Sequence, residues 1–304
     1  MSIRSYLKQI GRGSKGASDL SREHAKDLFT HILNQDVTDL EIGAFCLAMR
    51  IKGETADELA GFYDAALDHL PKLSYERPTI LLPSYNGARK TMLMTPLLAK
   101  LLADMGFSVL VHGLHEEITR TSSETVFKAQ HWPIAANAVD IVAHLQTSRL
   151  VYCPLPVLCP ALARLLTVRQ TIGLRNSGHI LAKLLNPFES QSLQICNYTH
   201  PAYPTILDAF FTLHPANVIL MRGHEGEPVA SPRRLPSLHI KLNQSAVCLD
   251  TEVIMIEEDT ARLDTIELTD TIDLYDACLR QKASPPATLI KQTQVIQQTM
   301  NALS

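Results

Sequence analysis

The most conspicuous chemical feature of the sequence is a long basic segment that contains no acid. Between Asp140 and Glu189 lie 48 residues without a single Asp or Glu. They include five cations, which are Arg149, Arg164, Arg169, Arg175 and Lys183. A segment of this kind needs an anionic partner, or acids from elsewhere in the chain, to offset its own repulsion. Two interpretations remain open: a surface that binds an anionic ligand, and a buried helix pair whose Arg side chains form internal ion pairs.

Polar loops that follow predicted strands are the second place where chemistry is expected. Open parallel sheets bind their ligands at the carboxyl ends of the strands. Residues 84–89 (SYNGAR) follow the apolar run 79–83, and a His-Gly pair ends the run 108–112. The residues suited to contact a ligand are Ser84, Asn86, Gly87, His112 and Gly113. One glycine is a weak basis for a phosphate-binding loop, so these residues define a residual ligand loop and no more.

The sequence predicts neither a metal site nor a nucleophilic centre. Glu225 and Glu227 could hold Mg²⁺, but no second carboxylate cluster accompanies them. His112 and His115 are too isolated to act as metal ligands. The six cysteines are dispersed without a CxxC pair, which argues against zinc and against a disulfide framework. Since no Ser/His/Asp or Cys/His arrangement stands out either, we predict no metal, no cofactor and no covalent catalysis.

The first 72 residues predict a small all-helical domain. A helix runs from Ser21 to about Asn34. Two more helices begin at residues 38–41 and 55–58, where a Thr oxygen and a Glu carboxylate can satisfy reciprocal backbone amides in a capping box. The first twenty residues are basic, and the glycines of the segment 11–16 (GRGSKG) predict a loop there, which we interpret as a mobile arm or turn.

From Thr79 onward the pattern changes to strands that alternate with helices. The predicted strands cover residues 79–83, 108–112, 149–153, 192–196 and 217–221. This alternation indicates an α/β domain with a central, mostly parallel sheet. The helical stretch 156–186 interrupts it and should pack back onto the N-terminal helices. Edge strands over 238–257 and helices at about 269–281 and 286–303 complete the chain. We therefore predict a helical domain over 1–72, completed by about 155–187, and an α/β domain over 73–304.

Composition favours a soluble globular protein, with 46% hydrophobic and 19% charged residues in a chain of 304. No apolar run reaches about 18 residues, so we expect no membrane-spanning helix. The N-terminal residues lack the apolar core of a signal peptide, which favours the cytoplasm. Charge is uneven: residues 1–249 carry a net +3, whereas residues 250–276 hold ten acids and one cation. The net charge of −3 therefore neither favours nor excludes a nucleic-acid partner, because distribution is what matters.

Several segments resemble the anthranilate phosphoribosyltransferase family, across nearly the whole chain. They are residues 56–65 (ADELAGFYDA), 111–113 (VHG) and, above all, 173–187 (GLRNSGHILAKLLNP). The resemblance implies a small helical domain joined to an α/β domain, and a dimer formed through the helical domains. It also places Arg175 on the family's anthranilate-contacting Arg.

The motifs that perform catalysis in this family are altered here. The family's phosphate-binding loop is Gly-Thr-Gly-Gly-Asp, whereas residues 84–88 read Ser-Tyr-Asn-Gly-Ala. Its Lys-His-Gly motif has become Val-His-Gly at 111–113, and its paired serines fall on Ile118 and Thr119. Its metal-binding Asp-Glu pair has no counterpart, because Gly226 separates the two candidate glutamates. Together these losses remove phosphoribosyl pyrophosphate and Mg²⁺ contacts, so the resemblance predicts a homologue that is not an enzyme.

Five short segments are similar to the YbiB-like branch of this family. They are PSYNGAR (83–89), RIKGE (50–54), the RNS-containing helix, HPxY (200–203) and GxEGEP (223–228). That branch consists of bacterial homologues that bind nucleic acid without sequence specificity, through a basic groove on a homodimer. The resemblance therefore implies a cytoplasmic DNA-binding homodimer that makes backbone contacts and has no membrane partner. The acidic residues 250–276 depart from this pattern and would have to face away from the groove.

We predict two groups of nucleic-acid-binding residues. The principal group is Arg164, Arg169, Arg175 and Lys183, and the secondary group is Arg233 and Arg234 in an exposed basic turn. Cations of this kind bind phosphates by neutralising charge and releasing counterions. The alternative is a phosphoribosyltransferase-type enzyme with altered donor-binding loops, and a weaker one is an interaction scaffold that uses the acidic block. The sequence does not separate DNA from RNA, or single from double strands.

Overall fold

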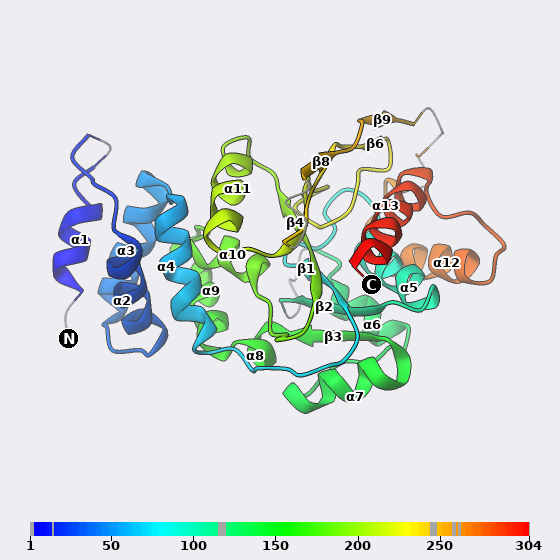
Figure 1. Cartoon of the computed structure of the whole chain (residues 1–304), viewed down its shortest axis with the longest axis horizontal. Coiled ribbons are helices and arrows are strands. Elements are labelled where there is room, and N and C mark those ends of the chain that lie inside the picture. Colours follow the sequence, from blue (N-terminus) through cyan, green and yellow to red (C-terminus); the bar gives the residue numbers. More distant parts are fainter. Residues whose placement is uncertain are drawn as a thin grey trace. The chain divides into compact units, whose positions relative to one another are not determined.

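The computed structural model describes residues 3–13, 15–114, 120–243, 248–256, 260 and 263–303. The chain divides into two compact units (Figure 1). Unit 1 contains Met1–Pro71, Cys159–Leu185 and Ala202–Pro215, and unit 2 contains Lys72–Leu158, Asn186–Pro201 and Ala216–Ser304.

Unit 1 is entirely helical. Its elements are α1 (Arg4–Ile10), α2 (Arg22–Leu33), α3 (Asp39–Lys52), α4 (Ala56–Leu67), α9 (Pro160–Ile172), α10 (Gly178–Leu181), the 3₁₀ turn η1 (Ala182–Leu184) and α11 (Tyr203–Leu213). Both predicted capping boxes are present, at Thr38 and at Thr55. The short basic helix α1 precedes the predicted loop and was not predicted itself; its buried Ile10 and the buried Ile3 before it hold it in place.

Aromatic rings form the core of unit 1. Phe29 stacks on Phe62 with ring centroids 4.7 Å apart, and Phe45 meets both rings edge-on, at 6.0 and 5.7 Å. Offset and edge-to-face pairs of this kind add to the stabilisation that burial alone provides. A second aromatic contact, between Tyr63 and Phe210 at 5.3 Å, holds α11 against α4. Residues 202–215 therefore belong with the helices, although the sequence pattern assigned them to the α/β domain.

The basic stretch is not one continuous helix. It was predicted as helical over 156–186, but α9 begins at Pro160 and ends at Gly173, whose φ of 71° is left-handed. Glycine adopts this conformation without steric cost, and it commonly terminates helices. The four residues of α8 (Leu155–Leu158) lie in unit 2, on the other side of the division.

Unit 2 is built on a seven-stranded sheet. Its strands are β1 (Thr79–Ser84), β2 (Ser108–Gly113), β3 (Leu150–Pro154), β4 (Ser192–Tyr198), β5 (Asn217–Arg222), β7 (Leu238–Lys241) and β8 (Cys248–Asp250). Their order is β3-β2-β1-β4-β5-β7-β8. The first five are parallel, whereas β7 pairs antiparallel with β5 and β8 pairs antiparallel with β7, so the predicted mostly parallel sheet is confirmed. A separate two-stranded sheet pairs β6 (Arg234–Leu235) with β9 (Ile254–Met255).

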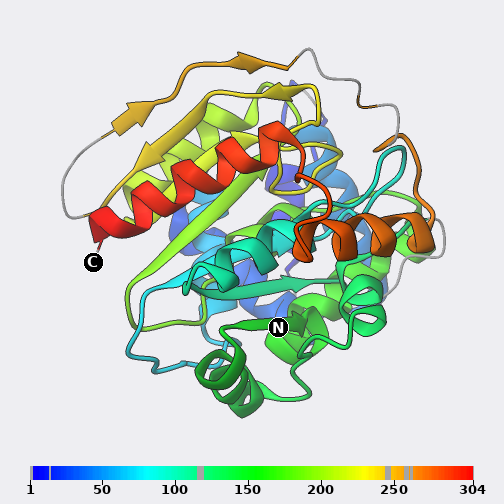
Figure 2. The same ribbon diagram turned by 90° about the vertical axis from the view of Figure 1, so that its right-hand side faces the viewer.

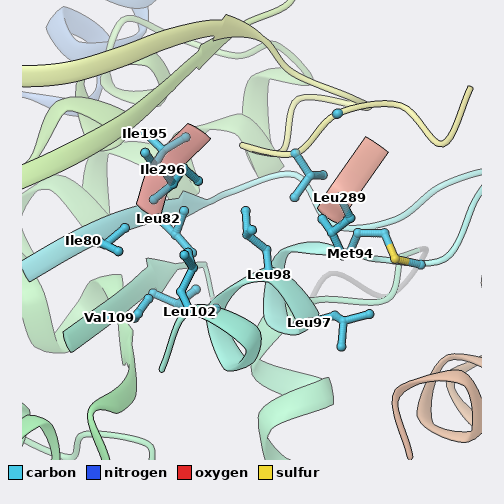
Figure 3. Close-up of a cluster of buried hydrophobic side chains, with 14 of the residues drawn as sticks. Ile80, Leu82, Met94, Leu97, Leu98, Leu102, Val109, Ile195, Leu289 and Ile296 are labelled. Carbon is cyan, nitrogen blue, oxygen red and sulfur yellow. The ribbon is translucent and has the colours of Figure 1, made fainter. Parts of the chain in front are cut away.

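The helices that accompany this sheet are α5 (Thr95–Asp104), α6 (Ser123–Ala129), α7 (Ala138–Ser148), α8, α12 (Leu268–Leu279) and α13 (Ala287–Leu303). Four of them, α5, α6, α12 and α13, contribute residues to one hydrophobic cluster with the strands. Figure 2 shows α13 (red) beside α5 (cyan). Figure 3 shows why they associate: Leu98 of α5 and Ile296 of α13 are both buried in one cluster with Leu82 of β1. Ser122 caps α6 by accepting the N–H of Thr125, whereas the Thr121 hydroxyl donates to the carbonyl of Ile266.

The cysteines and the lengths of the helices also bear on expectations from the sequence. The five cysteines whose side chains are described are buried; they are Cys46, Cys153, Cys159, Cys196 and Cys278. In the described ranges, no helix combines the length and the apolar character needed to cross a bilayer.

Candidate functional site

The residues of the predicted residual ligand loop lie together at one edge of the sheet in unit 2. The strands β2, β1, β4 and β5 are consecutive parallel neighbours, so the loops that follow them meet at the same edge. Ser84 ends β1 directly opposite Gly113, which ends β2. Asn86 and Gly87 follow Ser84, and His112 precedes Gly113. The fold therefore brings all five residues into one region.

A buried carboxylate occupies the centre of this region. It belongs to Glu227, which the sequence suggested only as a possible Mg²⁺ ligand and which is 1% exposed. Its Oε1 accepts the backbone N–H groups of Asn86 and Gly87 at 2.8 and 2.9 Å. Its Oε2 accepts the hydroxyls of Ser84 and Thr95 at 2.5 and 2.8 Å. We call this arrangement the Glu227 site: two amides and two hydroxyls that all donate to one internal anion.

A tight turn positions the carboxylate. His224 and Glu227 pair across the turn, and Glu225 and Gly226 between them have φ angles of 52° and 86°. Two consecutive positive φ angles are the mark of a type I′ turn, which glycine favours and glutamate does not. The Oε2 atom of Glu225 accepts the backbone N–H groups of residues 89–90 at 2.5 and 3.2 Å. The loop after β1 therefore donates four backbone amides to the two carboxylates of this turn.

His112 is a neutral core residue in this structure. It is fully buried, and its Nδ1 lies 2.8 Å from the hydroxyl of Tyr85. Burial lowers the pKa of His112 to about 3, so the ring carries no charge near neutral pH. A Cβ atom at Gly113 would lie 1.9 Å from the carbonyl oxygen of Ser84, which explains why glycine is needed there. His115, Ile118 and Thr119, which the sequence also pointed to, lie outside the described residues.

Three of the four principal basic residues lie near enough to a buried histidine of unit 1 to lower its pKa. Burial lowers the pKa of His179 to about 4, and the positive charges of Arg175, Arg169 and Lys183 lower it as well. Each of these cations must lie close to the imidazole to have this effect. We call Arg169, Arg175 and Lys183, together with the histidine between them, the His179 cluster. Along the helical stretch they come from the last turn of α9, the following loop and η1.

Arg164 has a different position from the other three. Its guanidinium donates to the carbonyl oxygen of Leu33 at 3.1 Å, at the C-terminal end of α2. A cation at the end of a helix can donate to the last carbonyl groups, which have no partner within the helix, and it interacts favourably with the negative end of the helix dipole. The side chain is nevertheless exposed. Arg164 therefore has a structural role that the sequence did not reveal, besides any contact with a ligand.

An asparagine that the sequence did not single out organises the loop beside the His179 cluster. The Nδ2 atom of Asn176 donates to the carbonyl of Leu165 at 2.9 Å, and its Oδ1 accepts the N–H of Gly178 at 3.0 Å. The next residue, Ser177, donates its hydroxyl to Glu54 at 2.6 Å. Ser177 lies in the RNS segment and Glu54 in the RIKGE segment. They are more than 100 residues apart in the sequence, so no local pattern predicts their hydrogen bond.

Arg233 and Arg234 belong to unit 2, whereas the four principal basic residues belong to unit 1. Arg233 donates to the Thr260 hydroxyl at 2.8 Å and to the carboxylate of Asp264 at 2.9 Å. Asp264 belongs to the acidic block, so one of the two secondary cations is already paired with an internal acid. Arg234 is exposed on β6. In the described part of the chain, no group of three or more His, Cys, Asp or Glu side chains is placed to hold a metal ion.

Sequence comparisons with known proteins show the family to which the chain belongs. The helical bundle domain of the glycosyl transferase family matches residues 4–70, which form the first helices of unit 1. "Uncharacterized protein YbiB" of Escherichia coli (strain K12) is 41% identical over 244 residues, which cover 79% of this chain and 76% of that protein. The anthranilate phosphoribosyltransferase of Dictyoglomus thermophilum is 23% identical over 224 residues, covering 73% of this chain and 66% of the enzyme. The chain belongs to the anthranilate phosphoribosyltransferase-like family, in which YbiB is its relative.

Solved structures share the fold. Anthranilate phosphoribosyltransferase from Saccharomyces cerevisiae, in complex with PRPP and Mg, matches 99% of this chain and 89% of its own with a TM-score of 0.78 and 13% identity. The enzyme from Thermus thermophilus matches 94% of this chain and 85% of its own with a TM-score of 0.71 and 17% identity. The predicted fold class, a helical N-terminal domain with a larger α/β domain, is confirmed.

Proposed function

We propose that this protein is a cytoplasmic, non-catalytic homodimer that binds nucleic acid, DNA in particular, without sequence specificity. The observation behind this proposal is the His179 cluster, which contains three half-buried cations from one acid-free stretch, each close enough to a buried imidazole to lower its pKa. Cations gathered in this way attract a polyanion, and neutralising its phosphates releases counterions. In the dimer we expect this basic surface to form the groove that contacts phosphates.

The Glu227 site supports the absence of catalysis. A phosphoribosyl donor brings a pyrophosphate and Mg²⁺, and the loop after β1 is where the fold would place the pyrophosphate. In this chain the amides of Asn86 and Gly87 donate to Glu227 instead. A pyrophosphate cannot share these donors with a buried carboxylate, because the two anions would repel at close range. The residues present therefore do not fit the donor, and no reaction step is assigned to this loop.

The acidic block is compatible with the proposal. Residues 250–276 belong to unit 2, whereas the His179 cluster belongs to unit 1. Two acids of the block form internal ion pairs, Asp264 with Arg233 and Asp276 with Arg280. Both pairs are exposed, and exposed pairs contribute little to stability, but they reduce the negative field of the block.

Salt dependence tests the proposed function directly. We expect a labelled duplex and a labelled single strand of arbitrary sequence to raise fluorescence anisotropy on binding. If about six phosphates are neutralised, the affinity should fall on the order of 10³-fold between roughly 50 and 200 mM salt. Binding that is indifferent to salt, or absent at low salt, would contradict the proposal. A melting temperature raised by phosphoribosyl pyrophosphate with Mg²⁺ would favour the alternative, an enzyme with altered donor loops.

An apolar stripe on α3 supports the homodimer. Leu40, Ala44, Leu47 and Ile51 are spaced to share one helix face, and all four are exposed in the single chain. Leu40 is 84% exposed and Ile51 is 66% exposed. Aliphatic side chains aligned in this way mark an interaction surface, and here we assign it to a second copy of the chain.

Charged substitutions on this stripe should therefore produce monomers. Because each aliphatic side chain contributes roughly 1.5–3 kcal/mol when buried, Leu47→Glu with Ile51→Glu should raise the dimer dissociation constant at least on the order of 100-fold. Light scattering on a size-exclusion column measures the result. Val139→Glu is the matched control, since this residue is 78% exposed on α7 of unit 2. A double variant that remains dimeric would assign the interface elsewhere.

A further inference from the structure

The loop between β1 and α5 has the construction of an anion-binding site. It donates backbone amides from residues 86, 87, 89 and 90, and all four hydrogen bonds end on carboxylate oxygens. Thr95, the first residue of α5, adds its hydroxyl. Successive amides in a strand-to-helix loop, close to a helix N-terminus, are the groups that bind phosphate in many α/β proteins. Here the anions that they bind are part of the chain.

The turn that supplies these anions is fixed by several independent contacts. The Nδ2 atom of Asn86 donates to the carbonyl of Glu225 at 2.8 Å, and that of Asn197 donates to the carbonyl of Gly226 at 2.7 Å. A Cβ atom at Gly226 would lie 1.5 Å from the side-chain Nδ2 atom of Asn86. The φ of 52° at Glu225 is costly for a residue with a side chain, so these contacts must offset the strain. The turn therefore fixes the Glu225 and Glu227 carboxylates against the loop after β1.

We propose that Glu227 and Glu225 act as built-in substitutes for a bound phosphate or pyrophosphate, and that they keep closed a site which such an anion would otherwise fill. Every donor of the Glu227 site faces the carboxylate of this one residue. Removal of that carboxylate would leave two buried amides without an acceptor, which is unfavourable unless another anion replaces it. The latent ligand is a small oxyanion of the phosphate class, and its affinity should appear only when the internal anion is absent.

The inference goes beyond nucleic-acid binding and can be tested without any nucleic acid. Its failure would leave nucleic-acid binding by the His179 cluster untouched, and only a gain for the wild type would also count against the non-catalytic part of the proposed function. The variants are Glu227→Ala, which opens the site, and Glu227→Gln, which keeps the volume and the oxygen acceptor but removes the charge. Melting temperature is measured with and without inorganic pyrophosphate, against potassium chloride of equal ionic strength. We expect Glu227→Ala to melt below the wild type and to regain about 2–4 °C with millimolar pyrophosphate. Wild type and Glu227→Gln should show no such gain, because the side chain still fills the site.

Two results would overturn the inference. One is an equal gain for the wild type, which would mean that the site is open. The other is a destabilised Glu227→Ala variant that does not respond to pyrophosphate, which would mean that the carboxylate has a purely structural role. If Glu227→Ala does not fold, Glu227→Ser replaces it, since its short side chain also removes the carboxylate from the Asn86 and Gly87 amides. Glu227→Ser should then show the same gain with pyrophosphate, and its absence would equally reject the inference.

Discussion

Replacing Arg169 and Arg175 by glutamate should weaken nucleic-acid binding at least roughly 60-fold at about 0.1 M salt. Each phosphate contact contributes a factor of about 8 under these conditions, so two lost contacts account for this value before any added repulsion. The slope of log affinity against log salt should become shallower by about 2. The loss should be the same for every sequence tested, because phosphates and not bases are the groups contacted. Anisotropy titrations at several salt concentrations measure both quantities.

The matched control reverses the same number of charges elsewhere. Arg280→Glu with Lys282→Glu changes the net charge equally, but these residues follow α12 in unit 2. If general attraction between the protein and a polyanion explained binding, both double variants would lose affinity alike. We expect the control to lose no more than about tenfold, since charges outside the contact surface act only through a field that salt screens. Equal losses would reject the His179 cluster as the binding surface.

The variant with glutamate at residues 169 and 175 also tests whether these two side chains lie near His179. The pKa of His179 is lowered to about 4 by burial and then by the neighbouring cations, so glutamates at 169 and 175 should raise it toward the ordinary value near 6.5. An NMR titration of the ring would show this change if the two side chains lie where the structure places them. Arg164 is a poorer choice for charge reversal, because a carboxylate beside the Leu33 carbonyl would also destabilise α2.

The fold could be predicted where neighbouring residues determine the structure. The capping boxes at Thr38 and Thr55 form as the spacing predicts, and the apolar runs at 79–83 and 108–112 become parallel strands. Each of these signals lies within a few residues, so a single sequence is sufficient to detect it. The helix over 4–10 was missed because two buried isoleucines outweigh the glycines that follow, and burial is not visible in a short basic segment.

The candidate sites could be predicted only in part, since they depend on contacts between distant residues. Glu227 lies 140 residues or more from the Asn86 and Gly87 amides that it accepts. No periodicity connects them, and the sequence therefore suggested a metal ligand where the structure has an internal anion. The acid-free stretch predicts the basic residues as one group, but only the fold separates Arg164, at the end of α2, from the three whose charges lower the pKa of His179.

A second large effect concerns the stability of unit 1, which must hold the His179 cluster in place. Glu58→Ala should reduce the free energy of unfolding by roughly 3–5 kcal/mol, the usual cost of removing one partner from a buried ion pair. The Glu58 side chain is fully buried, and its carboxylate accepts the N–H of Leu20 at 2.9 Å and the Nζ of Lys52 at 2.7 Å. It also accepts the N–H of Thr55 at 2.9 Å, which completes the capping box of α4. Chemical denaturation followed by circular dichroism measures the loss.

The chain contains a natural control for this substitution. Glu41 forms the same capping box with Thr38, but it is only half-buried, whereas Glu58 is fully buried. Glu41→Ala should therefore cost only about 1 kcal/mol, which is typical of a lost cap. Glu58→Gln should fall between the two, because the amide retains an acceptor while Lys52 keeps Asp19 as an ionic partner at 2.6 Å.

The pH dependence distinguishes the ion pair from the cap. Burial lowers the pKa of Lys52, but the hydrogen bonds to Asp19 and Glu58 raise it by more, so the folded pKa exceeds the ordinary value of 10.5. A base with a raised pKa stabilises the fold below its unfolded pKa, and this contribution is lost as the pH rises through the folded pKa. The difference between wild type and Glu58→Ala should therefore be full at neutral pH and shrink above about pH 10.5. If Glu58→Ala costs no more than Glu41→Ala at pH 7, the buried pair does not hold residues 20, 52 and 58 together, and another contact must fix the N-terminal segment to α4.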